Sequence, residues 1–178
     1  MKNFRFRLQA MCLMLMLGVA TMSAQNAIRY VDGTKTDNSG DGTSWASAKK
    51  DIQDAINDLV NNNLTGEVRV KAGIYKPTET TEASNVQYYK AFKIPAGITV
   101  RGGYATTNTG TSETKGGETI LSGNLTGTNA SFAFNNGKYN TSFYGNSYHV
   151  VWFAMNGFSN GRANALSKAA RLENCTVE

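Results

Sequence analysis

The chain has 178 residues, of which 18 are Lys or Arg and 13 are Asp or Glu, giving a formal net charge of +5. This small excess is not gathered into a long basic run, which argues against nucleic acid as a partner. Eighteen glycines against two prolines, with frequent Asn and Thr, are typical of many short strands joined by turns. Regularly spaced Val, Ile, Phe and Tyr supply apolar surface for a core, which argues against disorder.

The first 24 residues have the layout of a secretory signal peptide. Three basic residues precede an apolar run over residues 11–20, and small residues then lead to Ala24. Ten apolar residues are too few to span a bilayer, which takes about 20. We expect cleavage after Ala24 and no membrane span in the mature chain. Three of the 18 basic residues leave with the leader, so residues 25–178 keep 15 basic against 13 acidic residues and are expected to form one domain.

A short strand and a polar loop follow the leader. Residues 27–32, AIRYVD, alternate as a strand does, and the next segment, GTKTDNSGDGTS, holds Asp37 and Asp41 close together. Two acids on a glycine-rich loop can ligate Ca²⁺, although no Glu closes a twelve-residue calcium loop here. The alternative is an ordinary loop in which each Asp accepts hydrogen bonds from its own turn. We therefore assign no metal or other cofactor, and Asp37 and Asp41 stay weak calcium candidates.

The strongest periodic pattern predicts an amphipathic helix. Ser44 or Ser47 is expected to cap its start, and the asparagine-rich NNNLTG is expected to end it. The apolar residues recur at helical spacing and fall on a single face: Ile52, Ala55, Ile56, Leu59 and Val60.

Short strands separated by polar, glycine-rich connections are predicted after the helix. Residues 67–70 alternate, with Val68 and Val70 inward and Arg69 and Lys71 outward, before a turn at 72–75. Loops are expected at 78–90, 105–117 and 125–147. The other predicted strands cover residues 91–94, 98–104, 118–121, 148–155 and 170–177.

The order of these motifs resembles a known family. The segments concerned are GDGTSWASAKKDIQDAINDL, GEVRVKAGIYKPT, FKIPAGITVRGGY, ETILSGN, YHVV and LENCTVE. Together they resemble the N-terminal part of secreted right-handed parallel β-helix proteins of the pectin-lyase-like superfamily. The resemblance is greatest to bacterial surface members related to the chlamydial polymorphic outer-membrane proteins.

The resemblance implies a mainly β fold: the start of a right-handed parallel β-helix, a solenoid, with an N-terminal amphipathic capping helix. Such a cap is needed because the first coil of a stack leaves backbone groups and apolar side chains without partners. The family continues through many coils of solenoid period. LENCTVE resembles the first regular coil, so we expect the sequence to be a fragment of a longer repeat protein.

No constellation of residues in the sequence predicts catalysis, and we assign no catalytic residue. His149, the single histidine, has no acid beside it in the sequence, which favours a structural role over that of a general base. Lys and Arg at 69, 71, 93 and 101 can meet an acidic glycan or form a solvated face. Cys175 is the only cysteine after the leader. It is expected to be a buried, inert thiol, and the alternative is pairing with a cysteine of another segment or chain.

Two functions follow from the resemblance. The first is a secreted or cell-surface protein of the bacterial outer membrane region, a carbohydrate-binding or adhesin-like scaffold that contacts an extracellular glycan or a host or matrix surface. The second is the N-terminal part of a polysaccharide lyase or glycoside hydrolase whose active coils lie beyond Glu178. We prefer the first, because a fold does not by itself imply an activity.

Overall fold

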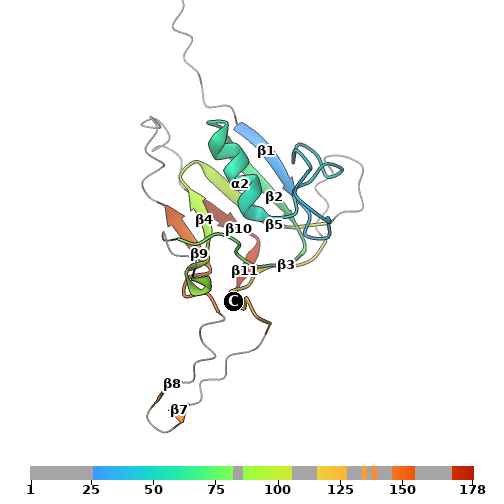
Figure 1. Ribbon diagram of the computed structural model, residues 1–178. Helices are drawn as coiled ribbons and strands as arrows, with labels where there is room; N and C mark the ends of the chain where they lie inside the picture. The colour runs from blue at the N-terminus through green and yellow to red at the C-terminus, as the bar shows by residue number, and fades with distance from the viewer. Residues whose placement is uncertain are drawn as a thin grey trace, which may run out of the picture.

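The computed structural model describes residues 26–81, 86–105, 116–127, 134–135, 138–139, 146–154 and 170–178. The predicted leader over 1–24 lies outside these residues. Over these described residues the fold is mainly β, with one α-helix, α2 (Ile52–Asn61), and one short 3-10 helix, η1 (Gln87–Tyr89) (Figure 1). The strands are β1 Asn26–Val31, β2 Thr65–Lys71, β3 Gly73–Tyr75, β4 Phe92–Pro95, β5 Ile98–Tyr104, β6 Thr119–Leu121, β7 Phe134–Asn135, β8 Lys138–Tyr139, β9 Val151–Ala154, β10 Arg171–Glu173 and β11 Cys175–Val177.

Three parallel sheets make up the body of the described fold. Their strand orders are β1-β2-β5-β10, β3-β6-β11 and β4-β9, and all their pairs are parallel. A fourth sheet, β7-β8, is an antiparallel pair. The chain therefore visits the three parallel sheets in a repeating order, β4 to β5 to β6 and then β9 to β10 to β11. We call each such set a tier.

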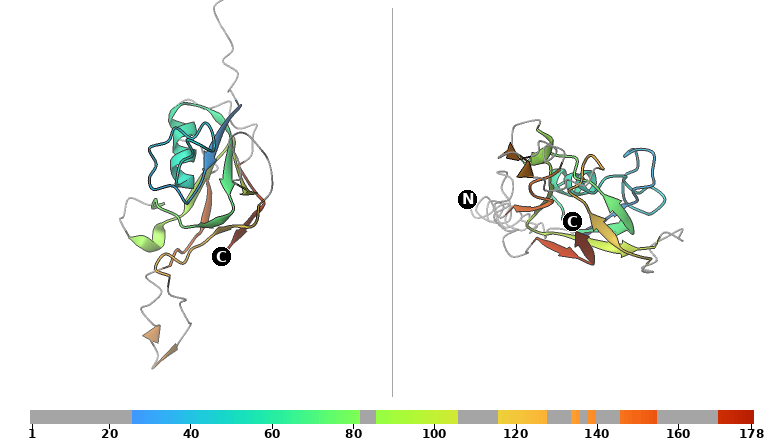
Figure 2. Two further views of the ribbon diagram at one scale, coloured as in Figure 1. Left: turned by 90° about the vertical axis from the view of Figure 1, so that its right-hand side faces the viewer. Right: turned by 90° about the horizontal axis from the view of Figure 1, so that it is seen from below.

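The helix takes the place of a strand in the first tier. α2 precedes β2 and β3 just as β4 precedes β5 and β6, and it packs against β1, β2 and β4. Figure 2 shows the helix lying against these strands. The predicted apolar face of the helix is confirmed, since Ile52, Ala55, Ile56 and Leu59 are all buried in the core.

The start of the helix differs from the prediction. Asp51 occupies the N-cap position and makes no side-chain capping bond, while Ser44 and Ser47 lie in the preceding loop. The prediction was wrong because Asn38 of the loop, and not a serine, binds the backbone where the helix begins. Asn38 Oδ1 accepts the backbone N–H groups of Lys50 at 2.7 Å and of Asp51 at 2.8 Å. An asparagine distant in sequence thus binds the backbone just before the helix.

Two other predicted elements are also corrected. The turn expected at 72–75 contains β3, and the strand expected at 170–177 is two strands, β10 and β11, in two different sheets. Asn174 separates them with a φ of 53°, a left-handed conformation that asparagine tolerates. The bend directs the alternating pattern on either side into different sheets, which periodicity alone does not reveal. The apolar strand expected from residue 148 begins at Val151.

Gln53 joins the helix to the edge of β4 that does not pair with β9. Its side chain is only 2% exposed. The Gln53 carbonyl oxygen accepts the N–H of Lys93 at 2.8 Å, and the Gln53 amide donates to the Lys93 carbonyl at 3.4 Å. A neighbouring strand would satisfy a β edge with the same pair of backbone bonds. One side chain of the helix therefore does at this edge what another strand would do.

Replacing Gln53 by leucine is expected to lower the free energy of unfolding by about 1–3 kcal/mol, because the N–H and carbonyl of Lys93 lose a buried partner. Urea denaturation of the full chain would measure the change. The matched control is Gln87→Leu, which alters an exposed glutamine of η1 and should cost far less. Equal losses from the two substitutions would contradict the role given to Gln53.

The last tier exposes side chains at inward positions. Phe153 is in register with Ile94, and Val177 with Leu121. Ile94 and Leu121 are fully buried, whereas Phe153 is 46% and Val177 49% exposed. Within the described residues, β9, β10 and β11 each pair on one side only. This end of the stack therefore presents strand edges together with apolar side chains.

Candidate ligand-binding surface

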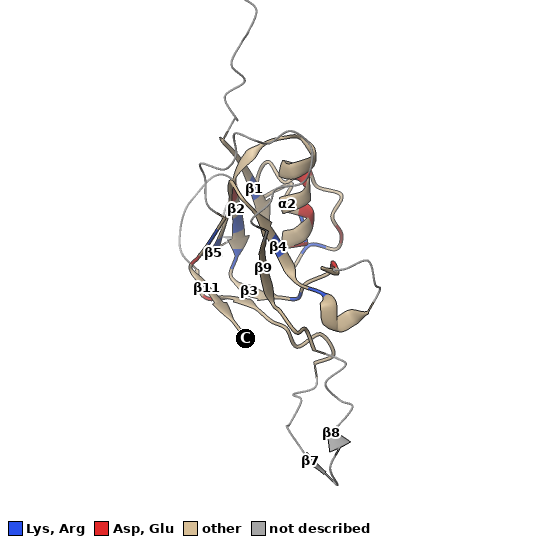
Figure 3. Ribbon diagram, turned by 90° about the vertical axis from the view of Figure 1, so that its left-hand side faces the viewer, with Lys and Arg blue, Asp and Glu red and all other residues tan. Residues whose placement is uncertain are grey.

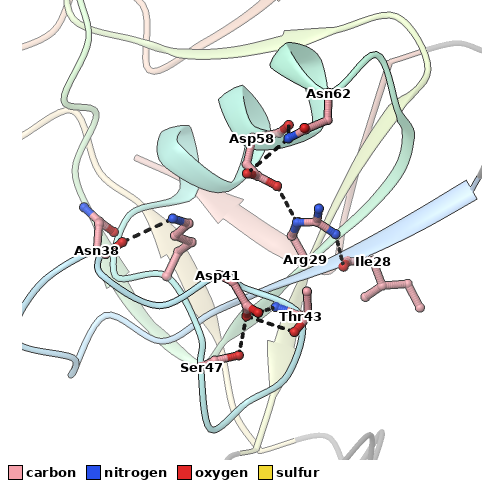
Figure 4. Close-up of polar contacts among 9 residues, drawn as sticks. Ile28, Arg29, Asn38, Asp41, Thr43, Ser47, Asp58 and Asn62 are labelled. Atoms are coloured by element: carbon pink, nitrogen blue, oxygen red, sulfur yellow. Dashed lines mark hydrogen bonds and ion pairs between the residues drawn. The ribbon is translucent and has the colours of Figure 1, made fainter.

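The two predicted calcium candidates lie in the loop that precedes the helix. Asp37 accepts the backbone N–H of Ser39 at 2.9 Å. Asp41 accepts the N–H of Thr43 at 2.9 Å and the hydroxyl of Ser47 at 2.6 Å (Figure 4). The hydrogen bond from Ser47, with those from Thr43, lowers the pKa of Asp41 to about 2. Each carboxylate thus binds its own turn. Over the described residues, no three His, Cys, Asp or Glu side chains gather as a metal site would require.

The same loop is tied to the sheet through β1 and the helix. Arg29 Nε lies 2.5 Å from a carboxylate oxygen of Asp58, and this ion pair links β1 to α2 (Figure 4). Asn38, from the loop, also accepts the Lys49 ammonium on its backbone carbonyl at 3.2 Å. The first contact holds β1 to the helix, and the second closes the loop on itself.

The predicted outward cations are all paired with acids of the chain. Arg69 binds Glu67 at 2.8 Å, Arg101 binds Glu173 at 2.8 Å, Lys71 binds Asp32 at 3.1 Å and Lys93 lies 3.6 Å from Glu79. The paired acids lie on β2, on β10 and in the segments that follow β1 and β3, and the ribbon in Figure 3 marks Lys and Arg in blue and Asp and Glu in red. Arg69, Lys71 and Arg101 therefore belong to a mixed-charge face of one sheet, and Lys93, on β4 in another sheet, is also paired with an acid. The four cations do not form a purely positive track for an acidic polymer.

A closed aromatic cluster covers the outer face of β1, β2 and β5. Trp45 packs edge-on against Tyr30, with ring centroids 4.8 Å apart, and lies 5.8 Å from Tyr104. The Arg69 guanidinium lies over both tyrosine rings, at 5.9 and 5.7 Å from their centroids. The three aromatic side chains are only 2–4% exposed. This cluster therefore fastens the loop to the sheet and offers no accessible surface.

His149 and Cys175 are found in different surroundings. His149 is exposed just before β9, with its ring 6.1 Å from that of Trp152. Cys175 is half-buried, and burial raises the pKa of its thiol to about 11. Its Sγ lies 3.4 Å from the Glu173 carbonyl. A thiol with so high a pKa is a poor nucleophile, which fits the prediction of an inert cysteine.

An accessible group of aromatic side chains lies where η1 meets the segment before β9. Tyr88 and Tyr148 have ring centroids 4.7 Å apart, and Tyr89 lies 4.6 Å from Tyr88 and 5.9 Å from Tyr148. The Tyr148 N–H donates to the Tyr88 carbonyl at 2.8 Å, which fixes the two segments side by side. Tyr148 is 59% exposed. Unlike the cluster around Trp45, this group includes a ring, that of Tyr148, with most of its area exposed.

A polar groove of about 440 Å³ is lined by Thr78, Glu79, Thr80, Lys90 and Lys93, with no aromatic ring in its lining. Lys90 directly follows the tyrosine pair in the chain. Trp152, 43% exposed, is in register with Lys93 on the neighbouring strand, so both side chains point to the same side of the sheet. We call the tyrosines 88, 89 and 148 with Trp152 the aromatic surface.

Two of the residues that line the groove are bound by side chains of α2. The Asn57 amide donates to Glu79, whose other carboxylate oxygen lies 3.6 Å from the Lys93 ammonium. Gln53 binds the backbone of Lys93, as described above. α2 therefore positions two of the lining residues, Glu79 and Lys93.

The sequence does not predict this surface. Tyr88 and Tyr89 fall in a segment expected to be a loop, and Tyr148 and Trp152 fall in an apolar strand. Two tyrosines followed by a lysine do not by themselves predict a binding surface, because the contact of Tyr88 with Tyr148 is long-range.

No family model matches this chain, and no curated protein or solved structure does either. In the part of the chain that the structure describes, neither helix is long and apolar enough to cross a membrane.

Proposed function

We propose that this chain forms the capped first coils of a right-handed parallel β-helix in a secreted or cell-surface bacterial protein. Its role in this proposal is that of an adhesin-like binding scaffold, without catalysis in this segment. Its partner is an extracellular glycan or a host or matrix surface.

The observation that carries the proposal is the repeated order of the tiers. Two successive sets of three strands visit the same three parallel sheets, and a helix fills the first strand position in the tier before them. Parallel strands joined by crossovers are right-handed in nearly all known cases, which supports the proposed hand. A repeating tier that buries its neighbours' apolar faces is the basis of solenoid folds.

The two ends of the stack support the same interpretation. At the helical end, Gln53 satisfies the backbone of β4 and Ile56 seals the core. At the other end, the exposed Phe153 and Val177 stand above buried Ile94 and Leu121, as they would if a further coil lay on them. We propose that such a coil covers this face in the full protein.

The proposed destination rests on the predicted leader, and the proposed role on the accessible aromatic surface and its groove. Exposed aromatic side chains beside convergent polar groups are a common basis of ligand recognition. The paired state of the outward cations supports a partner other than a polyanion.

Export and processing test the first part of the proposal. The full chain, expressed with its own leader in a bacterial host, is expected to yield an exported product whose N-terminus is Gln25, identified by mass spectrometry. Retention in the cytoplasm with an intact leader would contradict it. The processed chain is also expected to leave polygalacturonate uncleaved in a lyase assay. Measurable cleavage would favour the polysaccharide-degrading alternative.

A further inference from the structure

We infer that the aromatic surface and its groove bind a neutral glycan built of pyranose rings with equatorial hydroxyls, such as β-1,4-linked glucose or N-acetylglucosamine. This inference rests on the proposed function, since it names the ligand class and the site of a binding scaffold. The aromatic surface is linked to the groove by Lys90, which follows Tyr89 in the chain, and by Lys93, which is in register with Trp152.

The rings supply one half of the recognition. A pyranose ring with equatorial hydroxyls has an apolar face of C–H groups, which carry a slight positive charge. The face of an aromatic ring is slightly negative, so the two attract, and both lose apolar surface to water. Tyr148 at 59% and Trp152 at 43% exposure can each present ring area to a sugar.

The backbone segments that carry the rings are fixed before a ligand arrives. The Tyr148 N–H is bound to the Tyr88 carbonyl, the Phe92 N–H to the Val150 carbonyl at 2.8 Å, and the Ser147 hydroxyl to the Lys90 carbonyl. Trp152 belongs to β9, which pairs with β4 along its whole length. Preorganised rings lose little conformational entropy on binding, which favours affinity.

The groove supplies the other half of the recognition. Its lining combines carboxylate acceptors on Glu79, ammonium donors on Lys90 and Lys93, and hydroxyls on Thr78 and Thr80 that can do both. Sugar hydroxyls also donate and accept, so a lining of both kinds matches them. Trp152 and Lys93 project from paired positions about 4.8 Å apart, so that one sugar unit can touch a ring and a charged donor together.

The charges of the groove argue for a neutral sugar. Glu79 lies between Asn57 and Lys93, and its carboxylate lines the groove. Because Glu79 pairs with Lys93, Lys90 is the only lining cation that this carboxylate leaves unbalanced, too little positive charge for a polymer with a carboxylate on every unit. A neutral glycan meets Glu79 with hydroxyl donors instead.

Titration of the full, processed chain with cellohexaose, chitohexaose and polygalacturonate tests the inference. We expect calorimetric binding of cellohexaose or chitohexaose and none of polygalacturonate. Tryptophan fluorescence gives an independent signal, because Trp45 is 4% exposed and Trp152 is 43% exposed. A blue shift on binding is therefore expected to come from Trp152 and to vanish in Trp152→Phe, which keeps an aromatic ring and most of the affinity.

Two variants test the location of the site. Tyr148→Ala and Trp152→Ala should each weaken binding by about tenfold, through the lost ring contact. Tyr148→Phe should retain it. The matched control is Ile74→Ala, which removes a side chain that is 64% exposed on β3, in another sheet, and should leave affinity unchanged. Thermal unfolding of each variant checks that the fold is retained.

Several outcomes would overturn the inference. They are the absence of binding to both neutral oligosaccharides, binding of polygalacturonate alone, and binding that survives the double variant of Tyr148→Ala with Trp152→Ala. Self-association that both substitutions abolish would assign the surface to a protein contact instead. None of these outcomes changes the N-terminus of the exported product or creates lyase activity, so they are distinguishable from failure of the proposed function.

Discussion

Replacing Ile56 by aspartate is expected to release α2 from the strands and to make the protein aggregate. Ile56 is 1% exposed in the main core, on the helix face that covers β1, β2 and β4. The substitution removes a buried apolar side chain and puts an unpaired carboxylate in its place. We expect the free energy of unfolding to fall by about 4 kcal/mol or more, a large share of the stability of a small domain.

The aggregation follows from what the helix covers. Loss of α2 would uncover Phe92 and Ile94 and leave the β4 backbone without Gln53, so that an edge and apolar side chains meet solvent together. Urea denaturation and light scattering after size-exclusion chromatography would measure the two effects.

Asn61→Asp is the matched control for Ile56→Asp, because it places the same carboxylate on an exposed residue of the same helix. Its cost should be a few tenths of a kcal/mol up to about 1, from the negative end of the helix dipole. A monomeric Ile56→Asp protein with an unchanged unfolding transition would refute the role given to the helix.

The sequence predicts the helix well because its evidence is local. Five apolar residues at helical spacing define the buried face, and the structure buries four of them, with Val60 half-buried. The alternation at 67–70 likewise predicts Val68 and Val70 inward correctly. Burial of a periodic face is a property of consecutive residues, so it is legible without knowledge of the partner.

The features that the sequence does not reveal depend on contacts between distant segments. Gln53 looks like an ordinary polar residue of an amphipathic helix until β4 is seen to lack a neighbour at Lys93. Asn38 likewise displaces the expected serine caps only because its loop folds back to Lys50 and Asp51. The candidate surface also depends on a long-range contact. Tyr88 and Tyr148 are far apart in the sequence and share no local pattern, and only the fold brings their rings together.

The paired charges illustrate a further limit. Alternation places Arg69, Lys71 and Arg101 on outward positions, but whether they are free depends on the register between strands. Glu67 is diagonal to Arg101 across β2 and β5, and Glu173 is directly in register with it. The register between the strands therefore decides whether these outward cations are paired with acids or free.

Replacing Gly66 by alanine is expected to separate β1 from β2. A Cβ at this position would lie 1.8 Å from the carbonyl oxygen of Ala27, on the backbone of the neighbouring strand. Real side chains do not tolerate such a contact, and backbone cannot swing aside as a flexible side chain does. Because the β1 ladder begins at Asn26 and Ala27, the strand must shift along most of its length. We expect a loss of about 3 kcal/mol or more in the free energy of unfolding.

Gly73→Ala isolates this steric cause. Gly73 has a φ of 153°, close to the 158° of Gly66, and it also lies in a strand. Its nearest neighbour to an added Cβ is the Tyr75 ring at 3.7 Å, an ordinary contact. The backbone φ is therefore nearly the same at the two positions, while the space around an added Cβ is not. The difference between the urea midpoints of the two variants measures the cost of the clash between β1 and β2. If Gly66→Ala were no less stable than Gly73→Ala, β1 would not pair with β2 in this register. Amide hydrogen exchange over residues 26–31 should accelerate in Gly66→Ala and not in Gly73→Ala. That result would locate the loss of stability in β1, the strand whose Arg29 pairs with Asp58 of the helix.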